Sequence, residues 1–157
     1  MEAATDDKTA LRIRRIFRAP VAAVYAAWTD PAQVSCWMGP SDAFGPTDAT
    51  IDLRVGGRYR FVMHAPDGET HRVGGEFRAI VPDRKLVYTW AWESTPERES
   101  LVTVEFRAAS EGTELVLTHE RFADAPARDR HADGWTGCLA RFERHLAQTA
   151  TQPHTGE

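Results

Sequence analysis

The stretch RDRHADGWTGCLARFERHL, residues 128–146, has the apolar spacing of a long amphipathic helix. Asp124 can cap this helix with Pro126 in its first turn, and the pattern continues to about Gln148. Some 22 residues at about 1.5 Å each give about 33 Å, enough to lie across a whole sheet. Steps of four, four, three and four residues place these side chains on one stripe: His131, Trp135, Leu139, Phe142 and Leu146.

Two glycines, Gly134 and Gly137, interrupt this helix on either side of Trp135. A glycine inside a helix costs roughly 1 kcal/mol relative to alanine. Either the glycines let the helix approach the sheet closely, or they soften one turn so that Trp135 swings as the gate of a cavity. Both interpretations place Trp135 on the side that faces the sheet, and the sequence does not choose between them.

The sequence ahead of this helix predicts one strand, two short helices and then a run of strands. The first strand covers residues 11–19, where the alternation breaks at Ile16 and allows a β-bulge. A helix follows Pro20, and a second one, capped by Thr29 or Asp30, ends near residue 37. Turn signals then separate strands at 48–55, 57–64, 71–81, 85–93, 100–108 and 113–120. We expect an α+β fold with a curved antiparallel sheet of six to seven strands.

The turn residues also predict which strand residues pair. A two-residue turn at Glu111 and Gly112 would place Phe106 opposite Leu117 and Val104 opposite His119. One apolar face then carries a single histidine, and its members are Val102, Val104, Phe106, Leu115, Leu117 and His119. In the strand 85–93, the alternate residues Leu86, Tyr88, Trp90 and Trp92 have the larger apolar area, and we expect them to face inward.

Composition places the chain among single-domain globular proteins. It has 157 residues, 42% of them hydrophobic, and we expect one domain over residues 10–149 with flexible tails at 1–9 and 150–157. A formal net charge of -4 argues against nucleic acid as a partner, and no apolar run approaches the roughly 20 residues that span a bilayer. The two cysteines form no disulfide framework and no secretory leader is recognisable, so we expect a cytoplasmic protein.

Eight segments in order carry a resemblance to a known family. They are RAPVAAVYAAWTDP, CWMGP, DLRVGGRYRF, MHAPDGE, PDRKLVYTWAWE, LVTVEF, GTELVLTHERF and RDRHADGWTGCLARF. The chain resembles the bacterial proteins named after the C-terminal domain of the activator of the ninety-kilodalton heat-shock protein's ATPase, in the START-related SRPBCC superfamily. The resemblance covers about residues 12–147.

This resemblance implies a helix-grip fold, in which the sheet wraps the long helix and leaves an apolar cavity. Superfamily members hold lipids, sterols, polyketides or hormones there, and some catalyse cyclisation or dehydration. The eukaryotic namesake grips the chaperone with a separate N-terminal domain. The sequence here includes no such segment, so we expect no direct co-chaperone activity.

These patterns predict a site in the cavity, with a small hydrophobic or aromatic molecule as its occupant and no cofactor. The expected lining residues are Trp28, Trp37, Phe61, Met63, Tyr88, Trp90, Trp92, Val104, Phe106, Leu117, His119, His131, Trp135 and Leu139. His119 is the polar candidate on this apolar face, and it can donate or accept a hydrogen bond. His131, one turn before Trp135, lines the rim or packs at the helix end.

Catalytic and metal sites have weaker signals. Under a two-residue turn at Asp67 and Gly68, Glu76 would lie opposite Tyr59 and could transfer a proton, but the aromatic register of strand 85–93 tends to turn it outward. The same turn would place His64 opposite His71, which is half of a zinc site, and we expect no metal there.

The sequence therefore leaves three functions open. The first is a ligand-binding protein. The second is a cyclase, dehydratase or hydrolase, with His119 or Glu76 transferring a proton and Arg58 or Tyr59 binding an oxygen. The third is a chaperone-stimulating module. Exposed strand edges make a homodimer plausible.

Overall fold

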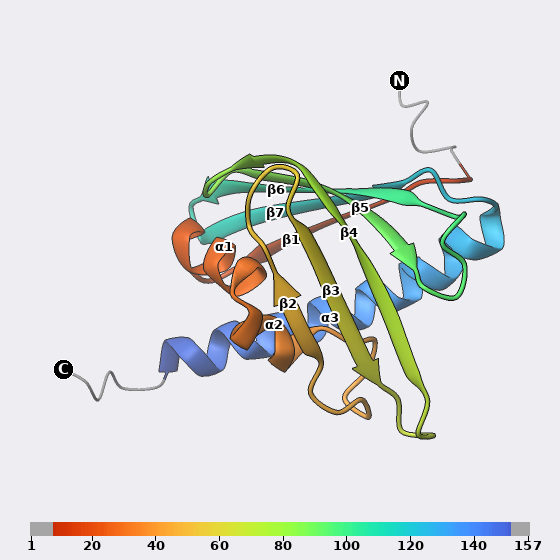
Figure 1. Ribbon diagram of the computed structural model, residues 1–157. Coiled ribbons are helices and arrows are strands. Elements are labelled where there is room, and N and C mark those ends of the chain that lie inside the picture. Colours follow the sequence, from red (N-terminus) through yellow and green to blue (C-terminus); the bar gives the residue numbers. More distant parts are fainter. Residues whose placement is uncertain (1–7, 152–157) are drawn as a thin grey trace.

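Seven antiparallel strands form one sheet that curves around a long C-terminal helix (Figure 1). The computed structural model describes residues 8–151. In chain order the elements are β1 (Leu11–Phe17), α1 (Val21–Thr29), α2 (Pro31–Trp37), β2 (Asp48–Ile51), β3 (Arg58–His64), β4 (Thr70–Val81), β5 (Lys85–Trp92), β6 (Ser100–Ala109), β7 (Gly112–Glu120) and α3 (Ala125–Thr151). This is the helix-grip arrangement that the sequence predicts.

The order of the strands in the sheet explains why two short helices follow the first strand. The strands lie in the order β1-β7-β6-β5-β4-β3-β2, so β1 and β2 are the two edges. The chain passes from one edge to the other through α1 and α2, which lie beside α3 (Figure 1). The three helices therefore share one face of the sheet, and the core lies between them and this face.

The helix boundaries follow from local chemistry. The Asp30 carboxylate accepts a hydrogen bond of 3.1 Å from the Ala32 N–H, and Pro31 occupies the first turn of α2. At the start of α3, Asp124 Oδ1 accepts a bond of 2.9 Å from the Ala127 N–H. α3 continues to Thr151, past the predicted end. Of the expected tails, residues 1–7 and 152–157 lie outside the described residues.

The first strand contains no bulge. Its pairing with β7 runs without interruption from Leu11 opposite His119 to Phe17 opposite Thr113. Ile16 breaks the apolar alternation because it points to solvent, with 40% of its surface exposed. The prediction that a β-bulge is possible at Ile16 is therefore wrong.

The hairpin between β3 and β4 has a three-residue loop in place of the predicted two-residue turn. The Ala65 N–H donates to the Glu69 carbonyl at 2.9 Å, and the Gly68 N–H donates back to the Ala65 carbonyl at 3.1 Å. Gly68 has a φ of 91°, which is favourable for glycine and completes a loop of this length. One extra loop residue shifts the pairing of the two strands by one.

This shift changes the position of three predicted site residues. His71 pairs with Met63 in place of His64, so the predicted histidine pair is wrong. Glu76 pairs with Arg58, and the prediction that it opposes Tyr59 is also wrong. Because neighbouring residues of a strand point to opposite faces, Glu76 lies on the outer face of the sheet.

The hairpin between β6 and β7 also turns at other residues than predicted. Residues 110–111 form the turn, and Gly112, with a φ of 144°, already belongs to β7. The predicted pairing of β6 with β7 is therefore shifted by two residues along β7. The observed pairs include Val102 with His119, Val104 with Leu117 and Phe106 with Leu115. A shift of two leaves each side chain on its predicted face, because successive side chains alternate between faces.

The aromatic face of β5 points inward, as predicted. Leu86, Tyr88 and Trp90 are buried, and Trp92 is partly buried. On the neighbouring β4, Phe77 contacts the Tyr88 ring at 5.7 Å between ring centroids. This row of rings on β5 lies beneath α3 and supplies part of the wall of the site.

Candidate functional site

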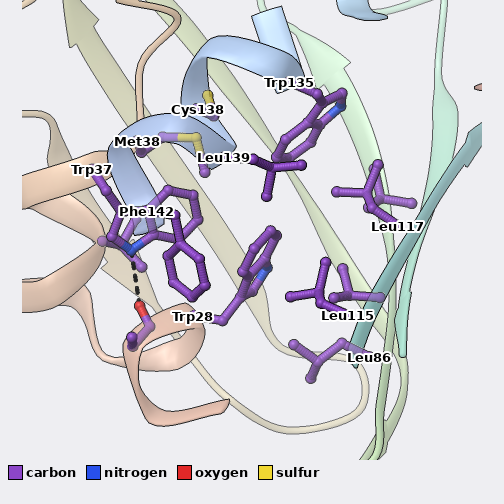
Figure 2. Close-up of a cluster of buried hydrophobic side chains, with 14 of the residues drawn as sticks. Trp28, Trp37, Met38, Leu86, Leu115, Leu117, Trp135, Cys138, Leu139 and Phe142 are labelled. Carbon is purple, nitrogen blue, oxygen red and sulfur yellow. Dashed lines mark hydrogen bonds between the residues drawn. The ribbon is translucent and has the colours of Figure 1, made fainter. Parts of the chain in front are cut away.

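The C-terminal half of α3 packs into a filled core, which we call the filled end. Phe142 lies within 5.1 Å of the Trp28 ring and 4.7 Å of the Trp37 ring, both in edge-on contacts. The Trp37 Nε1–H donates to the Ala27 carbonyl at 3.0 Å, the dashed line in Figure 2. Figure 2 shows Trp28 between Phe142 and Leu115, with Leu139 and the ribbon of α3 above. Trp37 and Phe142 are both 0% exposed, and their rings pack directly on one another.

The N-terminal half of α3 covers a hollow, which we call the cavity. Its volume is about 480 Å³. It lies between α3, the strands β3, β4 and β5, and the segment that follows α2. The lining residues are Met38, Pro40, Phe44, Met63, His71, Trp90, Trp92, Arg130, His131, Gly134, Trp135 and Cys138.

The two helix glycines have different surroundings. A Cβ added to Gly137 would lie 1.8 Å from the Pro40 carbonyl oxygen, so this glycine permits the close approach of another backbone segment. That segment follows α2, whereas the first interpretation named the sheet as the neighbour. A Cβ added to Gly134 would meet no atom within 4 Å, because Gly134 faces the cavity. Gly137 thus allows a close approach of backbone, and Gly134 does not serve that purpose.

Trp135 is held firmly in the cavity wall. Its Nε1–H donates to His119 Nδ1 at 2.9 Å, and its ring stacks on Trp28 at 6.1 Å between centroids. It also contacts the Trp90 ring at 5.2 Å and is only 3% exposed. A swinging gate requires a side chain with few contacts, and Trp135 has many. This geometry favours a fixed wall.

His119 is enclosed by hydrogen bonds behind that wall. Its Nε2 lies 2.7 Å from Ser100 Oγ, and Ser100 Oγ donates to the Trp90 carbonyl at 3.1 Å. Because Nδ1 accepts from Trp135, the proton of the neutral ring is on Nε2, which donates to Ser100. Burial and the nearby His131 lower the pKa of His119 well below its ordinary value, so the ring is neutral.

This arrangement makes Ser100 and His119 a poor nucleophile and base. A histidine base must accept the serine proton, whereas here Nε2 donates toward Ser100 Oγ. Accepting it would require Trp135 to give up its bond to Nδ1. His119 therefore acts as a hydrogen-bonded support between β7 and α3.

A second tryptophan–histidine bond joins the sheet to α3 at the cavity. The Trp92 Nε1–H donates to His131 Nε2 at 2.8 Å, and His131 Nδ1 lies 2.7 Å from the Ala127 carbonyl, to which it donates. Burial and the positive charge of Arg130 lower the pKa of His131, while the bond to Ala127 raises it. The neutral form is therefore favoured, and it fixes Trp92 as a second wall.

Few polar groups of the cavity remain free for a ligand. The Trp90 Nε1–H is buried without a hydrogen-bond partner among the described residues, although its ring lines the cavity. A buried donor left in this state costs about 1–3 kcal/mol. Burial raises the pKa of the Cys138 thiol to about 11, so Cys138 contributes a neutral wall.

The structure places the predicted site residues in two groups. Met63, Trp90, Trp92, His131 and Trp135 line the cavity. The others lie outside its lining, packed in the core around it: Trp28, Trp37, Phe61, Tyr88, Val104, Phe106, Leu117, His119 and Leu139. Glu76 lies on the outer face, where its carboxylate is 3.9 Å from Arg78.

Sequence reasoning missed several lining residues. Met38, Pro40 and Phe44 belong to an irregular segment without a repeating apolar pattern. The correct register of the β3–β4 hairpin would have placed His71 opposite Met63, another lining residue, and its ring lies 6.3 Å from that of Phe44. Arg130 precedes the apolar stripe of α3 by one residue. Its position next to His131 was the one feature of the sequence that could have placed Arg130 at the rim of the cavity.

No helix of residues 8–151 is both long and apolar enough to span a membrane. Within these residues, no three His, Cys, Asp or Glu side chains gather in a way that could hold a metal ion.

Comparison with solved structures supports the fold over nearly the whole chain. The AHSA1 protein of Silicibacter pomeroyi is 28% identical, with a TM-score of 0.78 over 89% of this chain and 99% of that one. A protein of Rhodobacter sphaeroides is 25% identical, with a TM-score of 0.79 over 94% and 97%. The AHSA1-like protein of Aeromonas hydrophila is 25% identical, with a TM-score of 0.76 over 92% and 96%.

Comparison of sequences identifies the family. The human activator of 90 kDa heat shock protein ATPase homolog 1 is 33% identical over 94 residues, which are 59% of this chain and 25% of the human protein. The match thus spans about a quarter of that relative's length. The profile of the family "Activator of Hsp90 ATPase homolog 1-like protein" matches residues 18–147. With most of its length matched and the same fold, the chain belongs to this family.

Proposed function

We propose that the chain binds a small hydrophobic or aromatic molecule, of the lipid or polyketide kind, in the cavity beneath α3. The observation that carries the proposal is the cavity itself. Its volume of about 480 Å³ falls within the range of about 300–1,000 Å³ that is typical of small-molecule sites. Tryptophan, phenylalanine and methionine supply six of its twelve lining residues.

The hydrogen bonds around the cavity support a site that exists before the ligand binds. Trp92 and Trp135 each give their N–H to a histidine, so two large rings are fixed as walls and cannot collapse into the space. A preformed site loses less conformational entropy on binding. The N–H of Trp90, which has no hydrogen-bond partner among the described residues, is the donor in this wall that we expect an acceptor atom of the ligand to use.

A blocked cavity tests this function. Gly134→Leu places a side chain in the open space beside Gly134. The uncharged aromatic probe N-phenylnaphthylamine should bind the natural protein, with a rise in probe fluorescence, and its affinity should fall at least about tenfold in this variant. Ala140→Leu, on the exposed face of α3, is the matched control and should leave affinity unchanged. Equal affinity for all three proteins would contradict the proposal.

The other two functions receive less support from the geometry. A cyclase, dehydratase or hydrolase needs a proton-transferring group at the ligand, but Glu76 is on the outer face and His119 is enclosed behind Trp135. The name of the human relative refers to the ATPase of a chaperone, and the match covers a quarter of that protein. We expect no stimulation when this chain is added to the purified chaperone in an ATPase assay.

A further inference from the structure

Arg130 is the one residue with a formal charge among the twelve that line the cavity. It is exposed to solvent and also lines a neighbouring hollow of about 250 Å³, which shares Trp90, Trp92 and His131 with the cavity. Arg130 therefore lies at the mouth of the cavity, where the linings of the two hollows meet.

The guanidinium of Arg130 has no acidic partner. Within residues 8–151, no carboxylate forms an ion pair with it, since Asp129 pairs with Arg128 at 3.4 Å and Asp124 with Arg98 at 3.8 Å. Asp133 follows one helical turn later but makes no ion pair with Arg130. No Asp or Glu lines either hollow. Neither hollow therefore offers Arg130 a carboxylate from its own lining.

Beside Arg130 on α3, both ring nitrogens of His131 are already engaged. His131 accepts from Trp92 and donates to the Ala127 carbonyl, so it offers no free atom to a ligand. A guanidinium presents several N–H donors in a planar fork that matches a carboxylate or sulfonate. Such a group, placed beside apolar walls, recognises an amphipathic anion better than a neutral molecule.

We infer that the ligand is an amphipathic acid whose apolar body fills the cavity and whose carboxylate or similar oxyanion is bound by Arg130. This inference rests on the proposed function, because it assigns the chemical class of the ligand of the same site. It makes Arg130 a specificity-determining residue, whereas the rings of Trp92 and Trp135 accept any apolar body of the right size.

Two matched probes test the inference. Anilinonaphthalene sulfonate and N-phenylnaphthylamine share their aromatic body, but only the first carries an anionic group. The natural protein should bind the sulfonate more tightly than the neutral probe in a fluorescence titration. Arg130→Gln should weaken the sulfonate about tenfold, the loss expected for one charge-assisted hydrogen bond, and leave the neutral probe unchanged.

Control variants separate this inference from the proposed function. Arg12→Gln removes one exposed positive charge from β1, far from the cavity lining, and should change neither affinity. If Arg130→Gln leaves the sulfonate affinity intact, or weakens both probes equally, the inference is wrong while cavity binding stands. If neither probe binds the natural protein, or Gly134→Leu does not affect either probe, the proposed function fails and the inference fails with it.

Discussion

Gly134 and Gly137 lie within one turn of α3, but the space beside them differs. A Cβ added to Gly137 would overlap the backbone of Pro40, whereas a Cβ added to Gly134 would meet no atom within 4 Å. The filled end continues from Gly137 toward Phe142, and the cavity extends from Gly134 toward Arg130. One amphipathic helix thus closes a core with one half and covers a hollow with the other.

The difference lies in what covers the tryptophan rings, because their N–H groups donate hydrogen bonds in both regions. At the filled end, Trp28 and Trp37 pack directly on Phe142, and close packing stabilises them. At the cavity, Trp92 and Trp135 are held through their N–H groups by two histidines. Hydrogen bonds with a fixed direction can keep large rings in place without atoms on every side. Aromatic richness in a sequence therefore predicts a core and a cavity equally well.

The largest effect should come from Phe142→Ala at the filled end. Phe142 is 0% exposed, and its removal leaves a void that surrounding rings cannot fill, so we expect a loss of about 3–5 kcal/mol in the free energy of unfolding. Phe44→Ala at the cavity is the matched control, and should cost only about 1 kcal/mol because Phe44 is partly exposed beside empty space. Urea denaturation measures both. Equal losses would remove the distinction between the two ends.

Gly137→Ala should have the next largest effect. Its Cβ would overlap the Pro40 carbonyl, and backbone atoms cannot move aside without displacing the segment after α2. Overpacking of this kind costs about 1–3 kcal/mol and exceeds the gain of about 1 kcal/mol in helix propensity. We expect a net loss near 2 kcal/mol in urea denaturation. A stabilised variant would show that Pro40 and α3 are not packed closely.

The fold could be predicted from the sequence because several independent patterns indicate the same architecture. The stripe from His131 to Leu146, the turn residues and the strand alternation each restrict the architecture, and an error of two residues between β6 and β7 did not alter which side chains face α3. An error of one residue did matter in the β3–β4 hairpin. The predicted turn placed Glu76 opposite Tyr59, while the aromatic register of strand 85–93 turned it outward. The loop of residues 66–68 has three members, and Glu76 therefore lies on the outer face.

The site was harder to predict because strand alternation gives the face of a side chain and not its depth. His119 lies on the predicted face, but Trp90 and Trp135 stand between it and the cavity. The segment with Pro40 and Phe44 folds over the cavity mouth only through tertiary packing against Gly137. No local pattern encodes that contact.

A third, smaller effect concerns pH and the histidine behind Trp135. Burial, and then the charge of His131, lower the pKa of His119 well below 6.5. The unfolded chain therefore binds a proton near pH 6.5 while the folded chain does not, and stability is lost as the pH falls below that value. Between about pH 7.5 and 5.5, this group should reduce the free energy of unfolding by about 1.4 kcal/mol.

The variant His119→Asn isolates that contribution, since an amide oxygen can still accept from Trp135 and does not titrate. Urea denaturation at the two pH values should show a smaller difference for the variant than for the natural protein. Comparing the differences removes any loss of stability that the substitution itself causes at both pH values. Identical differences would mean that His119 becomes protonated in the folded protein as easily as in the unfolded chain.

The smallest effect, and the one with the opposite sign, should come from Gly134→Ala. The new methyl group meets no atom within 4 Å, so nothing opposes the gain in helix propensity and the loss of freedom in the unfolded chain. We expect a stabilisation of about 0.5–1 kcal/mol in urea denaturation, against a destabilisation for the same substitution at Gly137. A methyl group is also too small to fill about 480 Å³, so the affinity for N-phenylnaphthylamine should change little. If Gly134→Ala lowers stability, the space beside this residue is occupied in solution, and the cavity is smaller than its lining residues indicate.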